Sequence, residues 1–109
     1  MTDIRIVYVT AATLDEARRL GRAAVEERLA ACANILPGMR AIYRWEDAMQ
    51  DEGEVVLLLK TRAGLVETLT ARLVELHEYD CPCVLVLPVE GGNPGYLDWL
   101  RAETRADIG

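Results

Sequence analysis

Two cysteines and a histidine within one short segment are the residues of this sequence best suited to chemistry. Cys81 and Cys83 flank Pro82, and His77 lies shortly before them. In an extended chain, residues i and i+2 point to the same side, so both thiols are expected to face one way. Thiolates favour Cu(I) and Zn²⁺, and an imidazole adds a nitrogen ligand. We therefore hypothesise that Cys81, Cys83 and His77 bind one Cu(I).

The same segment has plainer interpretations, which the residues alone leave open. Metal sites more often show C-x2-C spacing or several Cys/His clusters. A free cysteine packs like a small hydrophobe, so Cys81 and Cys83 could be partly buried residues that lead into a strand. His77 is the only histidine and is expected at the end of a helix, where an imidazole can cap carbonyl groups.

Other candidate residues carry weaker signals. Cys32 lies among alanines, a setting that favours buried packing, and it is kept as a further candidate metal ligand. The acidic residues between positions 47 and 54 indicate a solvated hairpin tip, with weak divalent-cation binding as the alternative. The loop 91–95 precedes a helix, where an anion can bind. It lacks the lysine and the glycine spacing of phosphate-binding loops, so we interpret it as a turn.

Hydrophobic periodicity and turn residues predict the elements that must position these side chains. A capping box over Thr13–Glu16 begins a first helix of about 16 residues. Pro37-Gly38 predicts a bulge in a long second strand. Asn93 and Pro94 suit the N-cap and the first position of a short third helix. In order, the sequence predicts a strand over 4–10, a helix after Thr13, a strand over 31–45, a polar turn over 46–53, a strand over 54–61, a helix marked by Leu65, Leu69, Leu73 and Leu76, a strand over 84–87, and a helix over 95–102.

The order strand, helix, strand, strand, helix, strand is the βαββαβ pattern of ferredoxin-like domains, an α+β fold. The second strand is unusually long, since fourteen extended residues span roughly 45 Å. It is therefore expected to project beyond its own subunit. Residues 55–59 and 84–87 are apolar on both faces, which is typical of strands buried on both sides. The second face must be covered by the short third helix or by another copy of the chain.

Composition narrows the possible functions. The 109 residues fit a single domain over residues 1–109. A formal net charge of −6 disfavours nucleic acid as a partner. No apolar run is long enough for a membrane span, and the N-terminus lacks the pattern of a signal peptide. Three cysteines do not suggest a disulfide framework, so we expect a reducing cytoplasm.

Five segments, in this order along the chain, are similar to those of one family. Residues 27–35 resemble its passage from the first helix into the second strand, residues 42–45 a strand-end signature, and residues 54–61 its third strand. Leu87-Pro88-Val89 and residues 96–100 resemble its C-terminal signatures. Together they cover nearly the whole chain, which thus resembles the CutA family, the divalent-cation tolerance proteins.

The resemblance implies a tight homotrimer, similar in architecture to PII signal-transduction proteins, with the second and third strands paired across subunits. It implies tolerance of divalent metals, copper binding, a response to metal ions, no established catalysis and no organic cofactor. The family's His-Pro-Tyr-Asp segment reads His77-Glu78-Tyr79-Asp80 here, so the role of metal ligand carries over to His77. Cys83 stands where the family usually has a glutamate.

Five further residues are predicted to line a cleft between subunits of such an assembly. Tyr43 and Trp45 have the alternative of packing the trimer seam. On the third helix, Tyr96 and Trp99 are expected to anchor that helix to the sheet. The predicted cleft residues are Lys60, Tyr43, Trp45, Tyr79 and Glu90.

Three functions follow from these observations. The first is a non-catalytic, metal-binding homotrimer whose ion is divalent or soft, with copper favoured. The second is a PII-like regulator that binds a small metabolite between subunits and signals to a protein partner. The third is an enzyme such as an acylphosphatase-like hydrolase, for which the sequence offers no clustered arginine and asparagine loop. Fold alone does not decide among them.

Overall fold

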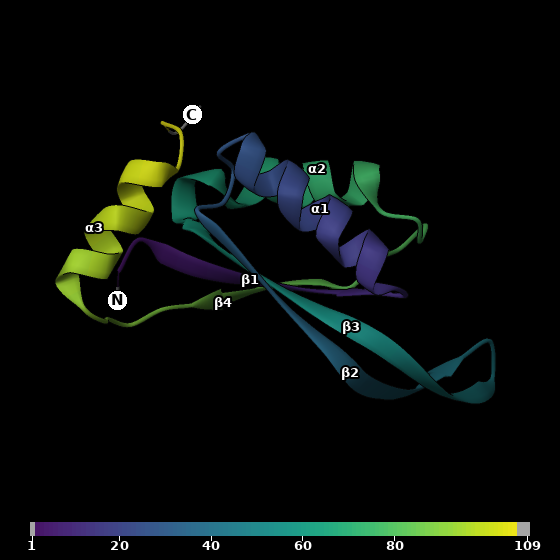
Figure 1. Ribbon diagram of the computed structural model, residues 1–109. Coiled ribbons are helices and arrows are strands. Elements are labelled where there is room, and N and C mark those ends of the chain that lie inside the picture. Colours follow the sequence, from purple (N-terminus) through teal and green to yellow (C-terminus); the bar gives the residue numbers. More distant parts are fainter. Residues whose placement is uncertain (1, 107–109) are drawn as a thin grey trace.

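The sheet and its helices follow the predicted order. A computed structural model describes residues 2–106 of the chain (Figure 1). The 4-stranded sheet has the order β2-β3-β1-β4, and every neighbouring pair is antiparallel, so the subunit is ferredoxin-like with an added C-terminal helix. The elements are β1 (Ile4–Ala11), α1 (Leu14–Glu26), β2 (Cys32–Trp45), β3 (Ala48–Arg62), a short 3-10 helix (Ala63–Leu65), α2 (Val66–Leu76), β4 (Val84–Pro88) and α3 (Pro94–Glu103).

α1 begins at the predicted capping residue. The Glu16 amide donates to the Thr13 hydroxyl at 3.1 Å, as the capping box predicts. In a capping box the Glu16 carboxylate would accept the amide of Thr13. Here Glu16 Oε1 instead accepts the amide of the preceding residue, Ala12, at 3.3 Å. α1 has 13 residues, fewer than expected, since Arg28 adopts a left-handed φ of 58° just after it. Within residues 2–106, no helix is long and apolar enough to cross a membrane.

α1 and α2 lie on one face of the sheet, and the main core lies between these two layers (Figure 1). Val7 pairs in register with Leu59, and Val9 pairs with Leu57, so alternate residues of β1 and β3 reach the helices. The buried cluster consists of Val7, Val9, Leu20, Ala24, Leu29, Ala30, Leu57, Leu59, Leu69 and Leu73.

Gly21 allows α1 to approach the sheet closely. A Cβ atom at this position would lie 3.0 Å from the Ala33 Cβ and 3.2 Å from the Leu57 Cδ1. Those separations are shorter than the ~3.5–4.0 Å of a favourable carbon contact. The glycine therefore lowers the intrinsic stability of the helix at this position. Because it has no Cβ, it also allows the short distance between α1 and the strands β2 and β3.

The β2–β3 hairpin differs from the prediction. β3 begins at Ala48 rather than at Glu54, and the turn consists only of Glu46 and Asp47, whose φ values are 49° and 63°. β1 ends at Ala11, opposite Val55, so beyond this level the hairpin is a two-stranded ribbon. With solvent on both faces, residues 48–53 carry no apolar alternation, and their polarity was wrongly interpreted as a turn.

The predicted bulge in β2 is confirmed. The register between β2 and β3 shifts between Leu36 and Met39, and Gly38 takes a φ of 86°. Beyond the bulge the hairpin extends away from the rest of the sheet (Figure 1), and the described chain is 44 Å along its longest axis. We call residues 39–54 the distal hairpin. Its large apolar side chains Ile42, Trp45 and Met49 are exposed.

The second sheet face, which we call the open face, is covered only at one end. Ile6 and Tyr8 lie on it, paired with Leu87 and Leu85 of β4. α3 covers the end near Ile4, which is buried with Ala31 and Leu100. Leu85 and Leu87 remain 57% and 46% exposed. The third helix thus accounts for part of the apolar excess on this face and leaves the rest uncovered.

A substitution at Gly21 tests the close approach of α1. Gly21→Ala is expected to lower the free energy of unfolding by about 1 kcal/mol, because an overpacking cost of ~1–3 kcal/mol exceeds a helix-propensity gain of ~1 kcal/mol. Adding Ala33→Gly removes the nearest atom, so the double variant should show a favourable coupling of about 1 kcal/mol in urea unfolding. A Gly21→Ala protein at least as stable as the wild type would contradict this account.

Candidate functional site

His77 is a buried, fully hydrogen-bonded residue at the junction of α2 with the loop that carries Cys81. Its Nε2 donates to the Thr10 carbonyl at 2.8 Å, and its Nδ1 accepts the Tyr79 amide at 3.0 Å. The ring therefore contacts β1 and its own loop, and the side chain does not cap α2. A metal bound at His77 would have to displace one of these hydrogen bonds. Its role as a ligand stays a prediction.

Glu16 holds the same junction from the other side. Its side chain is buried, and Oε2 accepts the Glu78 amide at 2.8 Å while lying 3.4 Å from His77 Nδ1. Oε1 accepts the amide of Ala12. One carboxylate thus links the start of α1 to the loop after α2. The capping-box pattern marked Glu16, but the contact with residue 78 depends on tertiary structure and has no local signal.

Cys81 and Cys83 occupy different environments in the loop before β4. All three cysteines are free thiols; Cys81 is exposed, and Cys83 is half-buried. Burial raises the pKa of the Cys83 thiol, and the Glu54 carboxylate raises it further, against the opposing effect of a hydrogen bond with Thr10. Within residues 2–106, no three or more His, Cys, Asp or Glu side chains form a group that could hold a metal ion. A single described chain therefore does not assemble the predicted ligand set.

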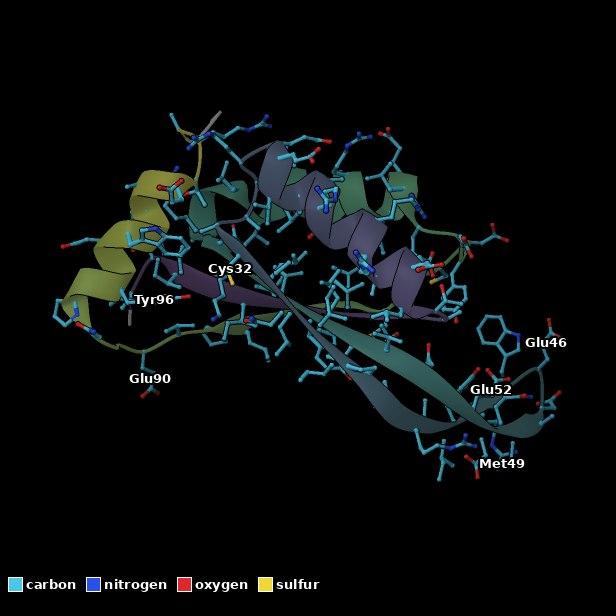
Figure 2. The ribbon with its side chains drawn as sticks, viewed as in Figure 1. Cys32, Glu46, Met49, Glu52, Glu90 and Tyr96 are labelled. Atoms are coloured by element: carbon cyan, nitrogen blue, oxygen red, sulfur yellow. The ribbon has the colours of Figure 1, made fainter. Side chains whose placement is uncertain are left out.

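Cys32 lies apart from this thiol pair. It is half-buried near the α3 end of the sheet, where it pairs in register with Lys60 (Figure 2). Cys83 instead precedes Val84, which pairs with Val9 further along β1. The Cys32 Sγ lies 3.8 Å from the Asn34 Oδ1. Cys32 also borders an open groove of about 420 Å³ between α1 and β2.

The five predicted cleft residues fall into two groups. Tyr43 and Tyr79 donate to the carboxylates of Glu52 and Glu54 at 3.1 and 3.4 Å. Burial, reinforced by Glu54, raises the pKa of Tyr79 to about 12, and burial together with Glu52 also raises the pKa of Tyr43. Both phenols therefore stay protonated at neutral pH. Trp45, 58% exposed, belongs to this end, at the turn of the hairpin.

Lys60 and Glu90 belong to the opposite end of the molecule. Lys60 Nζ donates to the Tyr96 hydroxyl at 3.1 Å and lies 5.3 Å from the centre of that ring. Glu90 points away from the ribbon into solvent (Figure 2). Tyr96 was expected only to anchor α3, together with Trp99. Their rings instead contact each other, with centroids 5.5 Å apart, and stay exposed, while Leu100 is the buried anchor.

Asp47, Asp51 and Glu52 of the hairpin are solvated, as predicted, whereas Glu54 is half-buried. Several of these carboxylates are already paired. Asp51 forms an ion pair with Arg40 at 2.6 Å, and Glu52 accepts a hydrogen bond from the hydroxyl of Tyr43. Glu46, Met49 and Glu52 gather near the far end of the hairpin (Figure 2). Asn93 is the N-cap of α3, as predicted: its Oδ1 accepts the Gly95 amide at 3.2 Å, and Pro94 and Gly95 already belong to the helix.

Removing the Glu16 carboxylate tests how the cysteine-bearing loop is held. Glu16→Ala is expected to lower the free energy of unfolding by about 2–4 kcal/mol, since two partly buried amides lose an acceptor at ~1–3 kcal/mol each. Glu16→Gln keeps one acceptor oxygen and should cost less. Glu26→Ala, on the exposed side of the same helix, should stay within ~0.5 kcal/mol of the wild type. Equal losses for the alanine and glutamine variants at position 16 would refute the hydrogen-bonding role.

Comparisons with known proteins match this arrangement over most of its length. Residues 5–103 match the family model described as CutA1 divalent ion tolerance protein. The chain is 44% identical over 100 residues to "Protein CutA, chloroplastic" of Arabidopsis thaliana, covering 92% of the chain but only 55% of that relative. It is 43% identical over 99 residues to the "Divalent-cation tolerance protein CutA" of Thermus thermophilus, covering 91% of the chain and 96% of that protein.

Solved structures agree in fold. The crystal structure of CutA from Xylella fastidiosa superimposes with a TM-score of 0.93 at 36% identity, covering 95% of this chain and 100% of that one. None of these three descriptions names a chemical reaction. The family model matches nearly the whole chain, and the relatives from Thermus thermophilus and Xylella fastidiosa are covered over nearly their whole length, so the chain belongs to the CutA1 divalent ion tolerance protein family.

Proposed function

We propose that this chain is a non-catalytic copper-binding protein that acts as a homotrimer in metal tolerance. The observation that carries the proposal is the pair of free thiols, Cys81 and Cys83, on a loop that a buried hydrogen-bond network fixes, in a member of a divalent ion tolerance family. Thiolates are soft ligands that select Cu(I). Three free cysteines suit a reducing compartment, and we propose the cytoplasm.

The metal would be shared or incompletely coordinated by one chain. Cys81 is exposed and can turn towards an ion. Cys83 binds a metal as the thiolate, and burial, which raises the pKa of its thiol, makes the loss of that proton harder. His77 could add nitrogen only by releasing the Tyr79 amide or the Thr10 carbonyl. A further ligand from another copy would complete the site without disturbing that network.

The homotrimer is proposed from the family resemblance and from exposed apolar surface. Leu36, Leu85 and Leu87 lie exposed on the open face, and Ile42 and Trp45 are exposed on the distal hairpin. Monomeric proteins rarely leave such extended apolar surface in water. Pairing of β2 and β3 across subunits would bury both regions.

A copper titration tests the metal assignment. With Cu(I) buffered by a competing ligand, the wild type is expected to bind one Cu(I) per chain. Cys81→Ser/Cys83→Ser should weaken binding by ~100-fold or more, because loss of even a second-shell partner costs ~10–100-fold. Affinity should rise with pH, since binding displaces thiol protons. Cys32→Ser is the matched control and should bind like the wild type. Equal affinities for the wild type and the double variant would sink the assignment.

Light scattering after size exclusion tests the assembly. The wild type is expected at three times the 12.1 kDa chain mass. Leu85→Asp places a charge on the open face and should yield single chains, whereas Leu14→Asp, on the exposed side of α1, should leave the mass unchanged. A wild-type protein that elutes with the mass of one chain at micromolar concentration would contradict the proposal.

A second candidate function is that of a PII-like regulator that binds a small metabolite. The observation favouring it is Lys60, whose ammonium lies in a groove beside α3 and forms no ion pair with a carboxylate in the described part of the chain. In this function the metal site is dispensable for ligand binding.

A further inference from the structure

We propose that the groove between α3 and the adjoining ends of β1 and β3 binds a small monocarboxylate with an apolar body, anchored by Lys60 and Tyr96. The proposal rests on the second candidate function and names its ligand class. We call this site the Lys60 groove. It has a volume of about 400 Å³, within the ~300–1,000 Å³ range of small-molecule sites.

Within the described residues, the charge in the groove has no carboxylate as counterion. Lys60 is the only lysine in the sequence, and the other basic residues are arginines. Several arginines pair with carboxylates, as Arg72 does with Glu27 at 3.0 Å and Arg101 with Asp3 at 2.9 Å. Lys60 is half-buried, and within residues 2–106 its polar side-chain partner is the neutral hydroxyl of Tyr96. An anion from outside the chain would supply the missing charge.

The polar end of the groove offers donors. Lys60 Nζ uses one of its protons on the Tyr96 oxygen, and two ammonium protons remain. The Tyr96 hydroxyl accepts from Lys60 and keeps its own proton to donate. The ammonium lies 5.3 Å from the centre of the Tyr96 ring, on the side of its hydroxyl. Lys60 and Tyr96 together thus suit a carboxylate, which accepts at both oxygens, and repel a metal cation.

The remainder of the groove is largely apolar, with Asn93 as its other polar side chain, and is open at its rim. The side chains of Ile4, Ile6 and Leu97 contribute to its lining, together with Val89 and Leu100. At Gly91, no atom of the described chain lies within 4 Å of where a Cβ would stand. Among residues 2–106 the lining holds one cation and no arginine, so the groove is poorly equipped for a phosphate dianion. A monocarboxylate attached to an aliphatic or aromatic body fits both ends.

Trp99 provides the signal for a binding experiment, because its ring contacts that of Tyr96. The full chain is titrated with phenylacetate, with its neutral analogue phenylacetamide and with inorganic phosphate. The wild type is expected to show saturable binding of phenylacetate, with phenylacetamide at least ~10-fold weaker, since a hydrogen bond to a charged group contributes the equivalent of ~10–100-fold. Phosphate should bind more weakly than phenylacetate.

Variants separate the anchor from general charge effects. Lys60→Met should lose ~10–100-fold in affinity for phenylacetate, and Tyr96→Phe should lose less. Arg18→Met removes the same charge from α1 and is expected to bind like the wild type. Circular dichroism and light scattering should show that Lys60→Met keeps the wild-type fold and mass. Lys60→Met should also keep wild-type Cu(I) affinity, so that a failure of copper binding is distinguishable from a failure here.

The following outcomes would overturn the proposal. They are the absence of saturable phenylacetate binding, unchanged affinity in Lys60→Met, tighter binding of phosphate than of phenylacetate, and dissociation of the assembly in Lys60→Met, which would assign the ammonium to contacts between copies. Equal binding of phenylacetate and phenylacetamide would also reject the carboxylate class, while leaving a small-molecule regulator in place.

Discussion

A four-stranded sheet with apolar side chains on both faces needs two covering layers, and the two helices of a βαββαβ chain supply one. β1 shows the consequence: Val7 and Val9 are fully buried against the helices, while Ile6 and Tyr8, on the opposite face, are only half-buried. α3 covers one end of the open face through Leu100, and it does not reach Leu85. The hydrophobic effect therefore leaves a driving force for association that the single chain does not use.

The same constraint places the two candidate sites at opposite ends of β1. At its C-terminal end, Thr10 binds the ring of His77 and contacts the thiol of Cys83, and Glu16 fixes the loop between them. At its N-terminal end, α3 closes over Ile4 and leaves the Lys60 groove, which Ile6 lines, beside it. The C-terminal end of β1 lies beside the thiol of Cys83, a soft ligand, and the N-terminal end lies beside the ammonium of Lys60 and the phenol of Tyr96. A cation and an anion would thus be held by separate parts of one sheet.

Local signals predicted those parts of the fold that depend on neighbouring residues. The Thr13 cap, the Asn93 cap and the bulge near Gly38 follow from side-chain and backbone preferences within a few positions. The start of β3 was missed because a ribbon with solvent on both faces has no apolar period. The register of β1 with β3 and β4, which unites Lys60 with α3, is likewise set by packing between distant segments.

The candidate site was less predictable than the fold, because its chemistry depends on partners far away in the sequence. His77 and Thr10 are 67 positions apart, and Lys60 and Tyr96 are 36 apart. The sequence indicated His77 as a possible ligand, whereas in the fold Thr10, far away in the sequence, engages one ring nitrogen and the nearby Tyr79 amide engages the other. Lys60 was one cleft candidate among five, and the contact with Tyr96 distinguishes it from the rest. Residue type indicated which side chains could act, whereas hydrogen bonding in the folded chain determines which of them keep a free donor or acceptor.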